Sequence, residues 1–114
     1  MEIKLNCIAD QQPIPAQYAF AAMDPDTHVA LSANRNPGVS WTDVPDGARS
    51  LILICVDPDV PSKPDDVNQE GRTVPADLPR TNFYHWVMID IPVQCSGIEA
   101  GSCSDGVVSG GKSA

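Results

Sequence analysis

Residues 50–61, which read SLILICVDPDVP, decide the fold of this chain. Residues 50–56 form a short, almost continuously apolar run, which is typical of a strand buried on both faces. Because side chains alternate across a strand, one face would hold Ile52, Ile54 and Val56, and the other Leu51, Leu53 and Cys55. The pattern therefore predicts a central strand of a sheet that ends at Asp57.

A second strong strand is predicted at residues 83–91, where apolar residues dominate and Pro92 supplies a stop. Strict alternation along this strand would place His85 on one face with Val87, Ile89 and Ile91. His85 and Trp86 lie near its start. Asp57 and His85 are therefore expected at the same end of the sheet.

Weaker alternating stretches predict strands at residues 3–7, 29–33 and 39–41, with turns at Asp24-Pro25-Asp26 and Pro45-Asp46-Gly47. Eleven prolines and eight glycines among 114 residues argue against a helical bundle. The length suits one domain. We expect a single all-β domain over residues 1–114, closing with a Gly/Ser-rich loop over residues 95–114.

The formal net charge of −8, with only seven Lys and Arg, argues against a nucleic-acid or anionic-membrane partner. No apolar run is long enough to span a bilayer, and no basic region precedes an apolar run as in a secretory signal. We therefore expect a cytoplasmic protein without stable membrane insertion.

The four cysteines, Cys7, Cys55, Cys95 and Cys103, contain no Cys-x-x-Cys pair, which disfavours a zinc site. Cys7 and Cys55 lie in apolar strand patterns, where a thiol packs as a small core residue. Reduced thiols are favoured over a disulfide framework.

Asp57, Asp59 and His85 are the candidate site residues. Proline fixes its own φ and keeps the preceding residue extended, so the two carboxylates that flank Pro58 can point the same way. Three chemistries suit such a cluster: a metal site, acid–base catalysis by an Asp-oriented histidine, and non-catalytic capture of an anion. A strand-ending turn beside an ordinary core histidine is the structural alternative.

Two other segments carry weaker signals. Residues 60–80 form a long polar connection, which could cover a pocket or simply be a solvated excursion. Residues 106–113 match the phosphate-loop pattern G-x-x-x-x-G-K-S. That pattern works only when a strand feeds it and a helix starts at the Lys, and this sequence offers no such helix and no acidic partner strand for magnesium, so a nucleotide site is disfavoured.

Four blocks in order identify a resemblance: Val39-Ser40-Trp41, Val44-Pro45-Asp46-Gly47, residues 50–61 with Asp57-Pro58-Asp59-Val60-Pro61, and residues 83–87 with His85. Together they resemble the phosphatidylethanolamine-binding protein family, and in particular its bacterial Raf-kinase-inhibitor-like branch. The resemblance covers roughly residues 1–95.

The resemblance implies an antiparallel two-sheet β-sandwich with a small anion pocket at one end. Its D-P-D-x-P motif falls on Asp57, Pro58, Asp59 and Pro61, and its pocket histidine on His85. It also implies a complementary C-terminal segment, including minor α-structure, that is not among these 114 residues.

From these observations we expect a non-catalytic module that binds a small anionic or zwitterionic ligand, such as phosphate, a carboxylate or a phosphoethanolamine head group. Asp57, Asp59 and His85 would bind it, and Pro58 and Pro61 would shape the pocket. No cofactor or resident metal is expected. The alternative is a metal-assisted or His-dependent hydrolase, and a homodimer is left open.

Overall fold

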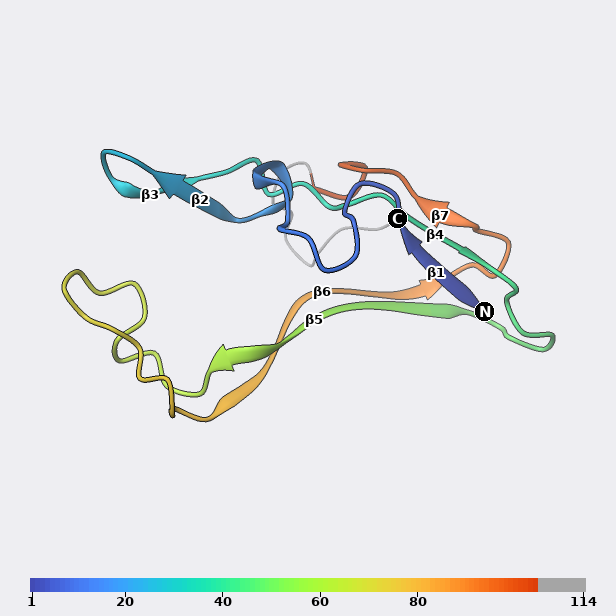
Figure 1. The fold of residues 1–114 in the computed structure, drawn as a ribbon. Helices are drawn as coiled ribbons and strands as arrows, with labels where there is room; N and C mark the ends of the chain where they lie inside the picture. The colour runs from blue at the N-terminus through green and yellow to red at the C-terminus, as the bar shows by residue number, and fades with distance from the viewer. Residues whose placement is uncertain (105–114) are drawn as a thin grey trace. The chain divides into compact units, whose positions relative to one another are not determined.

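A computed structural model describes residues 1–104, and their regular secondary structure is almost entirely strand (Figure 1). The elements in these residues are β1 (Glu2–Leu5), the 3-10 helix η1 (Ala16–Tyr18), β2 (Ala21–Asp24), β3 (His28–Leu31), β4 (Val39–Thr42), β5 (Leu51–Pro61), β6 (Arg80–Ile91) and β7 (Gly97–Ile98). All strand pairings among them are antiparallel. The predicted all-β class is confirmed.

The chain divides into two compact units. One consists of Met1–Arg49 together with the described residues from Pro92 onward, and the other is Ser50–Ile91. Within residues 1–104, no helix is long and apolar enough to cross a membrane.

The first unit holds a three-stranded sheet in the order β1-β4-β7. Strand β4 is central, and its Val39 and Trp41 are only 2% and 5% exposed. The Trp41 indole N–H donates to the Cys95 carbonyl at 2.8 Å, and the Trp41 backbone N–H donates to the Ser96 carbonyl at 2.9 Å. These two bonds hold the segment before β7 against the central strand.

Strand β7 was not predicted, because it has only two residues and lies in a segment rich in Gly and Ser. It can pair with β4 because Gly97 has no side chain. A Cβ at Gly97 would lie 2.6 Å from the Val39 carbonyl oxygen. The close approach of two backbones, rather than an apolar pattern, creates this strand.

Strands β2 and β3 form a separate hairpin, of which the sequence predicted only β3. The turn between them is the predicted Asp24-Pro25-Asp26 turn. The Asp24 carboxylate accepts hydrogen bonds from the backbone N–H groups of Asp26 and Thr27, at 3.0 and 2.8 Å, and from the Thr27 hydroxyl at 2.9 Å. These bonds stabilise the ionised carboxylate and lower the pKa of Asp24.

The second unit is built on the β5–β6 hairpin, a two-stranded sheet. The predicted end of the first strand at Asp57 is wrong, because β5 continues to Pro61 through a bulge between Asp57 and Val60. Pro58 has no N–H to donate, and the Asp59 N–H donates to the Asp57 carboxylate at 2.8 Å instead of to β6. Pairing resumes at Val60.

Strand β5 was also expected to be central in its sheet. Among residues 1–104 it pairs with β6 only, so that expectation is not met in the described part of the chain. The apolar pattern correctly predicted that both faces of β5 are hydrophobic. It does not indicate which segments pack on those faces, because those segments come from elsewhere in the sequence.

Two further bulges, both in β6, break the alternation predicted for residues 83–91. The register moves from Cys55 opposite Trp86 to Val56 opposite Tyr84, so His85 is an extra residue on β6. Likewise, Leu53 pairs with Met88 but Leu51 pairs with Ile91, and Asp90 has a positive φ of 56°. Each extra residue exchanges the two faces for the side chains beyond it on the strand.

The residues on each face of the hairpin therefore differ from those predicted by strict alternation. Val87 pairs with Ile54, whereas His85 is turned toward Asp57 and Phe83. The prediction that His85 shares a face with Val87, Ile89 and Ile91 is wrong, because the bulges separate His85 and Ile91 from the other two.

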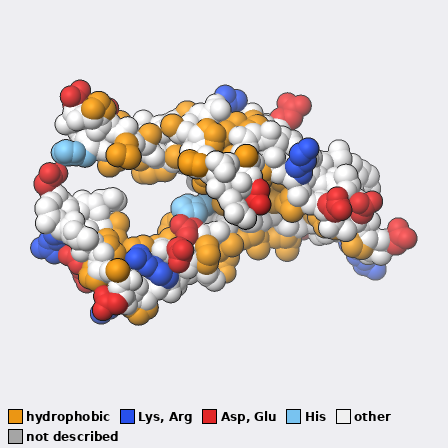
Figure 2. Space-filling view, in the orientation of Figure 1, with side chains coloured by type: hydrophobic (Ala, Val, Ile, Leu, Met, Phe, Trp, Pro, Cys, Tyr) orange, Lys and Arg blue, Asp and Glu red, His pale blue; other side chains and the backbone are white. Residues whose placement is uncertain are grey.

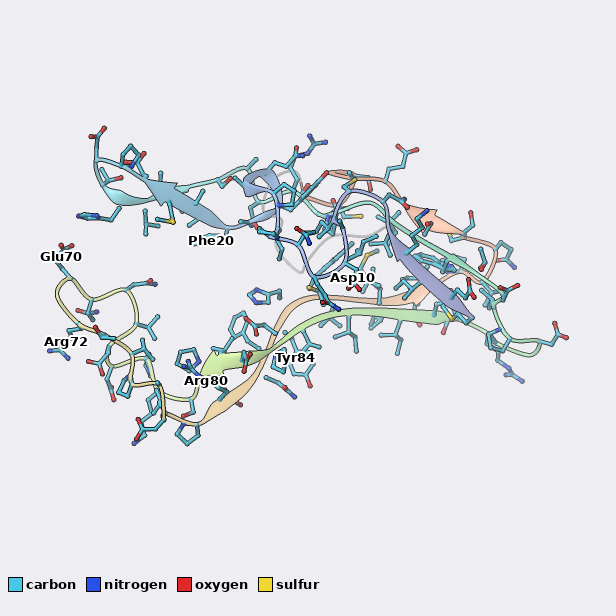
Figure 3. The ribbon with its side chains drawn as sticks, viewed as in Figure 1. Asp10, Phe20, Glu70, Arg72, Arg80 and Tyr84 are labelled. Atoms are coloured by element: carbon cyan, nitrogen blue, oxygen red, sulfur yellow. The ribbon has the colours of Figure 1, made fainter. Side chains whose placement is uncertain are left out.

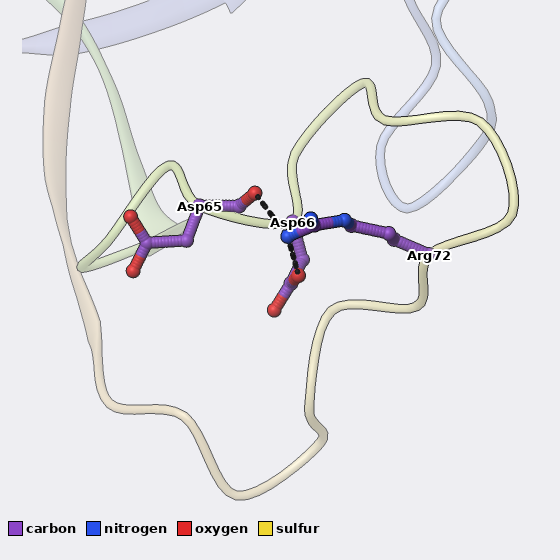
Figure 4. A network of polar contacts seen from close by, with 3 residues as sticks. All are labelled: Asp65, Asp66 and Arg72. Carbon is purple, nitrogen blue, oxygen red and sulfur yellow. Dashed lines mark hydrogen bonds and ion pairs between the residues drawn. The ribbon is translucent and has the colours of Figure 1, made fainter.

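The connection between β5 and β6 is closed at its base by the Ser62 N–H, which donates to the Pro79 carbonyl at 3.0 Å. Inside the loop, the Arg72 guanidinium lies 3.2 Å from the Asp66 carboxylate and 3.4 Å from the Asp65 carbonyl (Figure 4). Three tight turns begin at Pro64, Gln69 and Pro75. The loop between β5 and β6 is therefore held in shape by hydrogen bonds and an ion pair among its own residues.

Candidate functional site

The structure brings Asp57 and His85 together in the second unit. Asp57 Oδ2 lies 3.9 Å from His85 Nε2, and the two side chains are 44% and 53% exposed. The imidazole is therefore neither remote from the Asp-Pro-Asp motif nor sealed in an apolar interior. Solvent and small solutes can reach both groups.

The two carboxylate oxygens of Asp57 have different partners. Oδ1 accepts the Asp59 backbone N–H at 2.8 Å, and Oδ2 faces His85. Because the first contact belongs to the bulge, the local backbone fixes the carboxylate in front of the imidazole. Nε2 is turned toward Asp57, which leaves Nδ1 as the ring nitrogen for another partner.

Phe83 supports the other side of the imidazole, a contact that sequence reasoning missed. The rings of Phe83 and His85 have centroids 4.8 Å apart and an interplanar angle of 63°, an edge-to-face arrangement. The two residues are two positions apart on β6, so a period-two reading alone could have suggested that they are neighbours.

The remaining predicted residues lie at the β5 bulge or beyond it along the strand. Asp59 and Pro58 are exposed at the bulge, and Pro61 ends β5 opposite Arg80. Asp59 contributes to the site through its backbone N–H, which donates to the Asp57 carboxylate. Among residues 1–104, no three His, Cys, Asp or Glu side chains form a group that could hold a metal ion.

A separate hollow lies wholly within the first unit. It is open, measures about 410 Å³, and is lined by Asn6, Cys7, Gly38, Val39, Ser40 and residues 96–100. Hydrogen bonds from the Tyr18 hydroxyl and then from the Gly38 backbone lower the pKa of the Cys7 thiol, and the nearby Arg35 charge acts in the same direction. The same contact raises the pKa of Tyr18. The sequence patterns predicted strands at residues 3–7 and 39–41 but did not mark these residues as a site.

The phosphate-loop-like stretch at residues 106–113 lies outside the described residues.

Comparison with known proteins gives a family match along nearly the whole chain. Residues 5–114 match the family model described as phosphatidylethanolamine-binding protein. A UPF0098 protein from Methanothermobacter thermautotrophicus is 32% identical over 115 residues, covering 96% of this chain and 58% of that protein. The UPF0098 protein YbhB of Escherichia coli is 26% identical over 92 residues, covering 81% of this chain and 44% of YbhB.

A UPF0098 protein from Chlamydia pneumoniae is 25% identical over 91 residues, covering 80% of this chain and 52% of that protein. The chain thus spans about half the length of the curated relatives that it matches.

Proposed function

Because the chain belongs to the phosphatidylethanolamine-binding protein family, we propose that it is a non-catalytic binding module whose ligand is a small anion held at His85. The observation that carries the proposal is the exposed imidazole with Asp57 on one side and Phe83 on another. The ring is oriented by its neighbours yet open to solvent, as a ligand-binding group must be.

The chemistry of each group suggests its part in binding. The Nδ1 edge of His85 would donate to an oxygen of phosphate or a carboxylate. The exposed Asp59 carboxylate would meet an ammonium group if the ligand is zwitterionic. The family's name points to phosphoethanolamine as such a ligand.

We propose ligand capture without turnover, in line with the Raf-kinase-inhibitor-like branch that the sequence resembles. The hydrolase alternative gains no support from the family match, and the described residues provide no three-residue metal cluster.

NMR of histidine side chains provides a direct test, because the chain contains only two histidines, His28 and His85. Phosphate, acetate and phosphoethanolamine would each be titrated to about 10 mM, a range suited to weak anion binding. The ring signals of His85 should move with saturation while those of His28 stay in place. Unchanged His85 signals, or equal shifts at both rings, would refute the proposal.

A further inference from the structure

A cysteine, a tyrosine and an arginine converge beside the hollow of the first unit. Cys7 lines this hollow, Tyr18 lies in η1, and Arg35 lies on the segment before β4. All three residues belong to the first unit, so their arrangement does not depend on where the second unit lies. In Figure 3, the labels of Asp10 and Phe20 mark the segments that follow Cys7 and η1.

The surroundings of the Cys7 thiol favour its reactive form. The Tyr18 hydroxyl and the Gly38 backbone N–H donate to the sulfur, and together with the Arg35 charge they lower the pKa of the thiol. The side chain is only partly buried, and it borders an open hollow of about 410 Å³. A thiol that serves only as a small core residue is buried and inert. Cys7 therefore combines a stabilised thiolate with access for a small reactant.

Arg35 is held at the edge of the same hollow. Its guanidinium donates at 3.2 Å to the carbonyl of Ala100, which lines the hollow, and its backbone N–H donates at 2.9 Å to the Gln17 carbonyl. A Cβ at Gly101 would collide with the guanidinium, so a glycine there leaves room for it. On the face drawn in Figure 2, Lys and Arg side chains are dispersed rather than gathered in one patch. In a protein of net charge −8, Arg35 thus supplies a local positive charge beside the thiol.

We propose that Cys7 is a modification site that forms a mixed disulfide with a small zwitterionic thiol compound. The co-reactant is the oxidised, disulfide form of that compound. Arg35 would pair with its carboxylate, and Glu99, which also lines the hollow, would pair with its ammonium group. The volume of the hollow suits a small compound, since ligand pockets measure about 300–1,000 Å³.

The chemistry is thiol–disulfide exchange, which needs no oxidant besides the small disulfide. The Cys7 thiol gives its proton to water. Its thiolate then attacks one sulfur of the small disulfide, so that a bond forms between Sγ and that sulfur while the original sulfur–sulfur bond breaks. The other half leaves as a thiolate and takes up a proton. Cys7 is thereby oxidised to a mixed disulfide, and the released half is reduced to a thiol.

Peptide mapping by mass spectrometry after exchange with two small disulfides tests the proposal. The reduced chain would be incubated at neutral pH with oxidised glutathione, which carries carboxylates and ammonium groups, or with cystamine, which carries only ammonium groups. With oxidised glutathione, Cys7 should react at least about threefold faster than the exposed Cys55 and Cys95, because a lower thiol pKa gains more in thiolate fraction than it loses in nucleophilicity. With cystamine the preference for Cys7 should be smaller, since this reagent brings no carboxylate to Arg35.

A matched pair of arginine variants isolates the role of the charge. Arg35→Gln should lower the rate of Cys7 with oxidised glutathione, relative to its rate with cystamine, by about 2- to 5-fold, as expected for an exposed ion pair. The ratio of the two rates removes the effect of any change in the thiol pKa, because both reagents meet the same thiolate. Arg49→Gln removes another exposed arginine of the first unit, one that does not line the hollow, and should leave the ratio unchanged. Circular dichroism of each variant would show that the fold is retained.

Two results would overturn the proposal. One is a mixed disulfide at Cys7 that forms no faster than those at Cys55 and Cys95. The other is a ratio of the two rates that Arg35→Gln leaves unchanged, since this would show that the thiol reacts without recognising a carboxylate. His85 lies in the other unit, so either failure would leave the anion-binding proposal standing.

Discussion

Asp57 and His85 face each other between two bulges, one on each strand of the β5–β6 hairpin, with Oδ2 and Nε2 3.9 Å apart. Without the extra residue at His85, the imidazole would lie on the same side as Val87. The bulges thus give one face of an otherwise apolar hairpin a polar corner, formed by Asp57 and His85, and leave a continuous apolar surface on the other face.

Ligand selectivity should separate the roles of Asp59 and His85. Asp59→Asn should weaken phosphoethanolamine binding by about 2- to 5-fold, as expected for an exposed ion pair, and should not affect phosphate. His85→Gln should weaken both ligands. Titration calorimetry with the two ligands is the measurement, and equal loss of both in Asp59→Asn would contradict the assigned role.

The Asp57 side chain should matter for stability as well as for binding. Asp57→Ala removes the acceptor of the Asp59 N–H and should lower the free energy of unfolding by about 0.5–1 kcal/mol, a low value because the site is solvated. Asp57→Asn keeps an acceptor oxygen, so its free energy of unfolding should fall by less than that of Asp57→Ala. Urea denaturation of both variants is the measurement. Equal losses of stability in Asp57→Asn and Asp57→Ala would contradict a stabilising role for this hydrogen bond.

Two glycines that flank β4 should respond differently to alanine. Gly97→Ala would place a Cβ 2.6 Å from the Val39 carbonyl, so it should destabilise the fold by about 1–3 kcal/mol and open the β4–β7 pairing. Gly38→Ala meets its nearest atoms at 3.5 Å, an ordinary contact, and should change stability by less than about 0.5 kcal/mol. Denaturation midpoints compare the two, and similar losses would show that the close approach at Gly97 is unimportant.

Asn36 should be the costliest polar residue to replace in the first unit. It is 9% exposed, donates to the Glu99 carbonyl at 2.9 Å, and accepts from the Cys103 N–H at 2.9 Å. Asn36→Leu removes the acceptor of the Cys103 N–H and one of the donors to the Glu99 carbonyl, and should cost about 2–3 kcal/mol. Ser102→Ala, which removes an exposed bond to the same Glu99 carbonyl, is the control and should cost well under 1 kcal/mol. Thermal unfolding distinguishes them, and a neutral Asn36→Leu would refute the assignment.

Cys7 should be alkylated faster than Cys55 at neutral pH. Hydrogen bonds from Tyr18 and Gly38 lower the pKa of the Cys7 thiol, so its thiolate persists to lower pH. Tyr18→Phe removes the first of these donors, and the pH profile of iodoacetamide reaction at Cys7 should then move to higher pH. Peptide mapping by mass spectrometry gives the rates for each thiol, and an unchanged profile in Tyr18→Phe would count against the Tyr18 contact.

Much of the scaffold was predictable from local patterns. The strands around Ile54 and Val87 were expected because long apolar runs with β-branched residues favour extended chain, and the Asp24 turn was expected because Asp and Pro favour tight turns. Strand β2 and strand β7 were missed, since four weakly patterned residues and a Gly-Ile pair carry almost no local signal.

The proximity of Asp57 and His85 was predicted, but its geometry was not. Asp57 and His85 were expected at one end of the hairpin, and they meet there. Phe83 as a supporting ring and the exchange of faces at His85 were not foreseen. Both depend on bulges, and a bulge is set by which backbone groups pair across two strands rather than by the residues of one strand.

The sequence by itself determined the antiparallel β class, the two long strands and the residues that form the polar corner, because alternation, proline positions and apolar runs act over a few neighbouring residues. Only the tertiary structure decided the register. Register places His85 beside Asp57 and Val87 on the opposite, apolar face of the hairpin, because an extra residue in a strand reverses every side chain beyond it.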